Sequence, residues 1–424
     1  MKRIVLPLLI CLYPAFPAHA DEAELLERIE RLSTELESLR QEMQEMNSRT
    51  EAIADQQQET MATVAEASPA GAASPVSIWG YGEINYNRPT DDSSQTRMDL
   101  RRAVLGFGYD FSETTRLVSE FEFEHAVTSA DDEGEVAVEQ FYIDHSLTPN
   151  MNLKTGLFLI PMGFLNLSHE PTYYYGVERN FVETAIIPTT WREGGAGLYG
   201  STSRGIAWDV GITTGFNLGS WDPASTEGQE SPLGSIHQEL MNANARDLST
   251  YVALDYRGIP GWVAGASVFT GKVGQGDPAV SLASNSRVTL WEAHTRWTPG
   301  NLDLSALYAM GTISDTAALN LTFIGNPSLI PSEFWGGYVQ GAYRFPLAGT
   351  SSVSPFVRYE RYNTGADYEN LPMGLSVASL PTESVWTYGF NYNLNPHVVF
   401  KADYQHFSEN SAMNRFDVGL GLDF

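Results

Sequence analysis

Cysteine is almost absent from this sequence. Its 424 residues contain one, Cys11. That residue lies within residues 1–20, which have the pattern of a secretory signal peptide: Lys2 and Arg3 precede an apolar stretch, and a small-x-small cleavage site ends at Ala20. Because cleavage there would remove Cys11, we expect a mature chain with no disulfide, no thiolate metal site and no cysteine catalysis.

Basic residues and long apolar runs are also scarce. Lys and Arg number 25 against 52 Asp and Glu, which gives a net charge of −27 and argues against a nucleic-acid partner. After the signal peptide, no stretch approaches the roughly 20 apolar residues of a membrane-spanning helix. If the chain crosses a membrane, it must do so with strands. The many glycines and aromatic residues suit an all-β chain.

Signatures of enzymes are missing as well. The sequence has neither a G-x-S-x-G nor an H-E-x-x-H motif. Its histidines after the signal peptide are scattered, without the spacing of metal ligands. We therefore expect no enzymatic activity, no cofactor and no metal site.

Residues 21–64 carry a heptad repeat. Ile29, Leu36 and Met43 take one core position, and a second series that includes Leu32 and Leu39 takes the other. The pattern predicts an α-helical coiled coil and therefore self-association, without fixing the number of chains. A periplasmic location for it follows from the barrel described below, both ends of which we expect in the periplasm. A single amphipathic helix is the alternative, which the charged flanks disfavour. Residues 65–75 read as an Ala/Ser/Pro linker.

Period-two alternation dominates residues 76–424. Leu117, Phe121 and Phe123 would face one way, and Glu122 and Glu124 the other. Short and long connections alternate along this region, a rhythm typical of transmembrane barrels. We predict an all-β transmembrane barrel of about sixteen antiparallel strands, with both ends in the periplasm. No lumen-facing stripe is apolar enough for a dry core, so we expect a wet interior.

The last nine residues, 416–424, fit the closing strand of such a barrel. Phe416, Val418 and Phe424 share a face with Leu420 and Leu422, and polar residues occupy the opposite face. We expect this strand to pair with residues 76–86. The ending resembles the terminal strand of bacterial outer-membrane proteins, in which a final Phe is part of the signal for the barrel assembly machinery. This resemblance implies an outer-membrane location, with outer-membrane lipid and lipopolysaccharide around the barrel.

The third long connection, residues 161–192, is too apolar for a solvated loop, and we predict that it folds into the lumen and narrows it. Its charged side chains are candidates for a constriction: Glu170, Glu178, Arg179, Glu183 and Arg192. Pore candidates on the strands are Arg102, Arg116, Glu120, Lys154, Arg296, Arg344, Arg358 and Lys401. The alternatives are that the loop residues pack the loop or form trimer contacts, and that the strand residues are solvated or form salt bridges in the wall.

Several scattered motifs resemble the phosphate-selective porin family and its coiled-coil-bearing relatives. They are His169-Glu-Pro, the run from Val182 to Leu198, Arg101-Arg102-Ala103, Gly156 with Pro161-Met-Gly163, and Pro355-Phe-Val-Arg358-Tyr-Glu360. The resemblance implies a trimeric outer-membrane channel for passive uptake of small, usually anionic, solutes. The chain departs from the family where Leu159 and Ile160 replace an often-present lysine, so phosphate selectivity does not follow.

The leading hypothesis is an outer-membrane porin, a homotrimer that passes small hydrophilic solutes by diffusion. A structural protein that links the envelope through its coiled coil is the alternative. A third hypothesis, an outer-membrane hydrolase, is disfavoured by the missing motifs and the strand count.

Overall fold

The computed structural model describes residues 74–128, 134–369, 371 and 378–424. The predicted signal peptide and coiled coil, and all but the last two residues of the predicted linker, lie outside these ranges.

The described chain is built of β-strands joined by loops with short helical turns. The strands are β1 (Val76–Pro89), β2 (Arg97–Ser112), β3 (Thr115–Glu124), β4 (Glu135–Thr148), β5 (Met151–Leu159), β6 (Arg192–Ser201), β7 (Ile206–Thr213), β8 (Ser249–Ile259), β9 (Trp262–Lys272), β10 (Arg287–Trp297), β11 (Leu302–Ile313), β12 (Glu333–Tyr343), β13 (Phe345–Pro346), β14 (Ser352–Asp367), β15 (Glu383–Asn395), β16 (Val398–Phe407) and β17 (Arg415–Asp423). The helical segments are η1 (Ser93–Gln95), η2 (Val182–Ile186), η3 (Leu218–Ser220), α2 (Glu227–Glu230), η4 (Gly234–Ile236), η5 (Pro278–Ala283), α3 (Ala317–Asn320), η6 (Leu321–Phe323) and η7 (Ser411–Met413). None of the helices in the described ranges is both long and apolar enough to cross a membrane.

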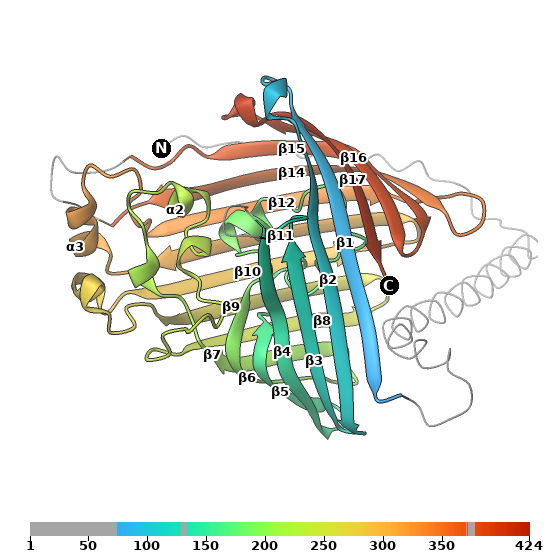
Figure 1. Cartoon of the computed structure of the whole chain (residues 1–424), viewed down its shortest axis with the longest axis horizontal. Helices are drawn as coiled ribbons and strands as arrows, with labels where there is room; N and C mark the ends of the chain where they lie inside the picture. The colour runs from blue at the N-terminus through green and yellow to red at the C-terminus, as the bar shows by residue number, and fades with distance from the viewer. Residues whose placement is uncertain (1–73, 129–133, 370, 372–377) are drawn as a thin grey trace, which may run out of the picture. The chain divides into compact units, whose positions relative to one another are not determined.

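The strands form one closed antiparallel sheet. Each pairs with its neighbours in the chain, and β1 pairs with both β2 and β17, as Figure 1 shows for the blue and red strands. The two-residue β13 only extends the turn between β12 and β14, so sixteen strands make the barrel wall. The predicted strand number is confirmed. The predicted closure is confirmed too, since Tyr81 pairs with Asp423 and Pro89 with Arg415.

The two faces of the wall differ as the alternation predicted. On β15, Trp386, Tyr388 and Phe390 are exposed on the outside, while Thr387 and Asn391 on the alternate face are buried on the inside. An apolar outer face is what lipid requires of a strand that crosses a membrane. A closed sheet also leaves no strand edge with unpaired backbone groups.

Long connections gather at one end of the barrel and tight turns at the other. The turns between β2 and β3 and between β4 and β5 have two residues each, 113–114 and 149–150, whereas residues 160–191 and 214–248 form long loops. The helices α2 and α3 mark the long-loop end, at the left of Figure 1.

The interior is not uniformly wet, contrary to the sequence-based expectation. Phe269 on β9, Leu290 on β10, Leu307 on β11 and Phe334 on β12 are buried in a single apolar cluster. The same cluster includes apolar side chains from the loops between β5 and β6, β7 and β8, β9 and β10, and β11 and β12. The loops therefore cover an apolar section of the inner wall.

Candidate channel constriction

Loop 3, defined here as residues 160–191 between β5 and β6, crosses the barrel interior. Its backbone contacts strands that are far from β5 and β6 around the wall. The amide of Val177 donates to Asp403 on β16 at 2.6 Å, and the amide of Phe181 donates to Glu360 on β14 at 2.6 Å. Arg358 on β14 donates to the carbonyl of Tyr175 at 3.1 Å. These acceptors and donors all lie on inward faces, so the loop lies within the lumen.

Aromatic and aliphatic side chains hold loop 3 on its apolar side. Trp191 packs against Phe216 and Phe269, with ring centroids 5.0 and 4.5 Å apart respectively. Ile186 and Ile187 are fully buried in the same cluster. Burial of these side chains removes apolar surface from water at about 25 cal/mol per Å², which explains why an apolar loop turns inward.

A sharp bend presents the tip of loop 3 to the opposite wall. Gly176 has φ +91°, a conformation that residues with a Cβ adopt rarely. The bend lets the Gly176 amide donate to Asn391 on β15 at 3.3 Å, while the same Asn391 side chain donates to the carbonyl of Tyr174 at 3.0 Å. On β16, the Nζ of Lys401 lies 3.6 Å from the ring centroid of Tyr174, a cation–π contact.

Glu183 stabilises the loop from within. Its carboxylate accepts the amides of Phe164 and Leu165 at 2.6 and 2.7 Å, and also accepts hydrogen bonds from Asn180 and Tyr338. Burial raises the pKa of Glu183, and these hydrogen bonds offset part of that rise. Glu183 therefore joins two parts of the loop to each other and to β12.

A charged cavity of about 210 Å³ separates loop 3 from the wall formed by β1, β2, β3 and β17. Its lining comprises Glu83, Arg101, Arg102, Glu122, Glu124, Tyr174, Glu178, Arg179, Phe181, Thr184, Thr189, Thr190 and Arg415. A register shift in the β1–β2 pairing leaves Arg101 without a partner on β1. Such a bulge re-aims side chains, and both Arg101 and Arg102 reach the cavity.

Ion pairs and hydrogen bonds fix most of the charges around this cavity. Arg102 lies 2.8 Å from Glu83 and 3.9 Å from Glu122, and it donates to the carbonyl of His169 at 2.6 Å. Across the cavity, Glu178 accepts from Asn85 and Asn87 on β1 at 3.2 and 3.0 Å.

Arg179 is the loop-3 cation that lines the cavity. It donates to Thr189 and, at 2.8 Å, to Thr190, both within the loop. Burial, followed by the nearby charge of Arg102, lowers the pKa of Arg179. Threonine hydroxyls orient this guanidinium without neutralising it, so its charge remains available to a solute in the cavity.

Three of the predicted pore residues, Arg102, Glu178 and Arg179, line this cavity together. Two others, Arg358 and Lys401, instead contact loop 3 from the far wall. The remaining strand candidates lie outside the cavity. Three form ion pairs: Lys154 with Asp209, Arg296 with Asp303, and Arg116 with Asp110. Glu120 accepts hydrogen bonds from Trp79 and Gln140, and Arg344 is exposed directly after β12.

The other loop candidates do not line this cavity. Arg192 pairs with Glu239 of the loop between β7 and β8 at 2.9 Å, Glu183 joins loop 3 to β12, and Glu170 is half-buried. Sequence reasoning missed Glu83 and Arg415, although alternation along β1 and β17 places Glu83 with Tyr81 and Arg415 with Asp417 on the inward face.

Comparisons with known proteins agree with this architecture. No protein-family model matches the chain. An uncharacterized protein of Aquifex aeolicus (strain VF5) is 31% identical over 341 residues, which cover 78% of this chain and 75% of that protein. The chain belongs to the family of this Aquifex protein.

Among solved structures, Salmonella typhi OmpF in complex with daunomycin matches with a TM-score of 0.57 and 14% identity, over 82% of this chain and 97% of that chain. A loop L8 deletion mutant of OmpT, an outer membrane protein of Vibrio cholerae, matches with a TM-score of 0.50 and 13% identity, over 82% and 99%. This chain, which belongs to the same family as the Aquifex protein, therefore has the fold of outer-membrane porins.

Proposed function

We propose that this protein is an outer-membrane porin through which small hydrophilic solutes diffuse passively. The observation that carries the proposal is the position of loop 3. It spans the lumen of a closed barrel and leaves a charged cavity against the β1–β3 and β17 wall. A barrel of this strand number encloses an aqueous channel, and an inward loop with charged neighbours narrows such a channel to solute size.

The charges of the cavity favour weak ion selectivity. Four arginines and four glutamates line it, and several of them are already paired. A solute that leaves bulk water there meets donors for anions and acceptors for cations. We therefore propose passage of small hydrophilic solutes of either sign. The anion preference implied by the resemblance to phosphate-selective porins would depend on Arg179 and on the arginines of β2.

The proposed assembly is a homotrimer in the bacterial outer membrane. The heptad repeat of residues 21–64 supports self-association, and the family resemblance supports three chains. The exposed aromatic and aliphatic outer face supports contact with outer-membrane lipid. We further propose that the barrel assembly machinery recognises Phe424 and that the outer loops contact lipopolysaccharide.

Conductance across planar bilayers tests this function. Full-length protein, with folding verified by its heat-dependent gel mobility, should insert in conductance steps that close in threes. A variant that lacks residues 21–64 should still conduct, because the barrel alone forms the passage. Correctly folded protein without conductance would refute the channel. If the deletion variant conducts normally but cells that carry it lose envelope integrity, the coiled coil has an additional structural role.

A further inference from the structure

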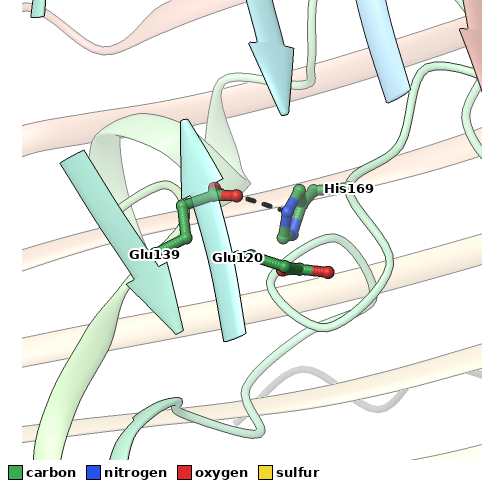
Figure 2. A group of neighbouring side chains, drawn as sticks. All are labelled: Glu120, Glu139 and His169. Carbon is green, nitrogen blue, oxygen red and sulfur yellow. Dashed lines mark ion pairs between the residues drawn. The ribbon is translucent and has the colours of Figure 1, made fainter. Parts of the chain in front are cut away.

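A cluster of metal-binding side chains lies beside the constriction. Glu120 of β3, Glu139 of β4 and His169 of loop 3 each offer one ligand atom, and these atoms lie within 4.8 Å of one another (Figure 2). All three residues are buried, Glu139 completely. The spacing of these residues in the sequence did not predict their grouping. Only the inward path of loop 3 brings His169 to these two strands.

The geometry of Glu139 and His169 suits a shared ion. Oε1 of Glu139 lies 3.5 Å from Nε2 of His169. In a tetrahedral site with ligand distances of about 2.1 Å, two ligand atoms are about 3.4 Å apart. Within the described part of the chain, this Oε1 accepts no hydrogen bond. A buried carboxylate oxygen without a donor is costly, and a bound cation would remove that cost.

The ring of His169 is held in the orientation of a metal ligand. Its Nδ1 lies 3.1 Å from the carbonyl oxygen of Asn166, which can only accept a hydrogen bond. In the neutral ring Nδ1 therefore carries the proton and Nε2 keeps its lone pair, with the Tyr81 hydroxyl 2.7 Å and Oε1 of Glu139 3.5 Å away. A backbone carbonyl that fixes the tautomer of a ligating histidine is a usual companion of metal sites.

Neutral donors satisfy the carboxylates of the cluster only in part. Glu120 accepts from Trp79 and Gln140. The hydroxyl of Tyr81 lies 2.9 Å from Oε2 of Glu139 and 2.7 Å from Nε2 of His169, and it can donate to one of them only. Nearby, Arg102 pairs with two other carboxylates, Glu83 and Glu122. Negative charge therefore remains at the cluster for a cation to balance.

We propose that Glu120, Glu139 and His169 bind one divalent transition-metal ion, for which Zn²⁺ is the best match. One imidazole nitrogen and two carboxylate oxygens form a ligand set typical of Zn²⁺, and a water molecule can fill the fourth position. Ca²⁺ and Mg²⁺ fit less well because they prefer oxygen ligands throughout. The ion fastens the first half of loop 3 to β3 and β4. This proposal stands independently of whether the barrel conducts.

Metal binding by the intact protein tests the proposal. Untagged full-length protein, stripped with a chelator in detergent, should bind one Zn²⁺ per chain in a calorimetric titration. Glu139→Gln and His169→Gln should each lower the affinity by more than about 100-fold, because a ligand matters more than its outer-shell partner. His294→Gln is the matched control. Its two nitrogens face separate carboxylates, Glu292 at 2.9 Å and Asp255 at 3.2 Å, so these do not converge on one ligand position.

X-ray absorption of the zinc-loaded wild-type protein supplies a readout that needs no variant. The expected first shell contains nitrogen and oxygen atoms at about 2.0–2.1 Å, with one imidazole and no sulfur. A shell with two imidazoles or none would overturn the site, as would wild-type protein that binds no Zn²⁺. Folded Glu139→Gln or His169→Gln protein that binds like the wild type would overturn it too. Tyr81→Phe removes a hydroxyl that contacts two of the proposed ligands but removes no ligand, so it should still bind one Zn²⁺ with a smaller loss of affinity than Glu139→Gln. A loss in folded Tyr81→Phe that exceeds the loss in Glu139→Gln would overturn the ligand assignment.

Discussion

Asn391 of β15 holds the backbone of loop 3 at Tyr174 from the opposite wall. Its Nδ2 donates to the Tyr174 carbonyl at 3.0 Å, and its Oδ1 accepts the amide of Gly176 at 3.3 Å. One side chain thereby satisfies two buried backbone groups on either side of the bend that Gly176 creates. This contact fixes the tip of loop 3 to β15.

Asn391→Ala should loosen the tip of loop 3. The variant leaves a buried carbonyl and a buried amide without partners, which costs about 1–3 kcal/mol for each group. We expect single-channel currents with more frequent brief transitions and a higher mean conductance. Asn393→Ala is the control, because Asn393 follows on the same face of β15 but takes no part in this loop-3 contact. Equal current noise in both variants would show that Asn391 does not fix the tip.

Arg179→Glu should shift the selectivity of the channel toward cations. Arg179 lines the cavity, and its hydrogen-bond partners Thr189 and Thr190 are neutral. Replacement of Arg179 by glutamate changes the charge of the passage by two units, at the point where an ion must shed water. The reversal potential in a salt gradient should therefore move toward the cation equilibrium value, corresponding to a several-fold change in the permeability ratio. Arg204→Glu, at the exposed turn between β6 and β7, should leave it unchanged.

The barrel was predictable from the sequence because lipid imposes a rule on each strand separately. Alternation in β15 and β17 specified which side chains face outward without knowledge of their neighbours. Closure was predictable for the same reason, and the structure completes it with a hydrogen bond from the Phe424 amide to the carbonyl of Gly80 at 2.9 Å.

The interior was only partly predictable because inward residues obey no such local rule. Phe334 and Leu307 look like ordinary strand residues until loops from other parts of the chain cover them. A carboxylate that caps a loop, such as Glu183, has the same sequence appearance as one that lines a channel. Its partners Phe164 and Tyr338 are distant in sequence, and only the folded loop brings them to it.

Trp191→Ala should destabilise the loop-covered section of the barrel. The Trp191 ring is fully buried between Phe216 and Phe269, and removal of a buried tryptophan side chain costs about 3–5 kcal/mol. The temperature at which the folded gel band converts to the unfolded band should fall. Trp191→Phe should have a smaller effect. Trp297→Ala, which removes an exposed ring from the outer face, should not affect loop-3 packing or channel noise.

Glu183 should make the stability of loop 3 depend on pH. The folded protein raises the pKa of this carboxyl through burial, so it binds the proton more tightly than the unfolded chain does. The contribution of Glu183 to the stability of loop 3 is therefore most favourable below its pKa in the unfolded chain, about 4.3, and is lost as pH rises through its raised pKa in the folded protein. Brief closures of the channel should become more frequent over that interval and then level off.

Glu183→Gln removes the titrating group and should flatten this pH profile. Glu227→Gln, which changes an exposed glutamate of α2, is the control and should retain the wild-type slope. A profile that is unaltered in Glu183→Gln would assign the pH dependence to another group.

Phe424→Asp should impair assembly and leave conduction intact in the molecules that do assemble. The Phe424 side chain is exposed on the outer face, while its backbone amide and carbonyl both bond to Gly80 and close the barrel. Substitution keeps those backbone bonds available but removes the terminal aromatic ring that an assembly machinery would bind. We expect a several-fold lower amount of folded protein in the outer membrane, with normal unit conductance after purification, and wild-type amounts for Phe424→Tyr. Normal membrane levels of Phe424→Asp would mean that the terminal ring is not part of the assembly signal.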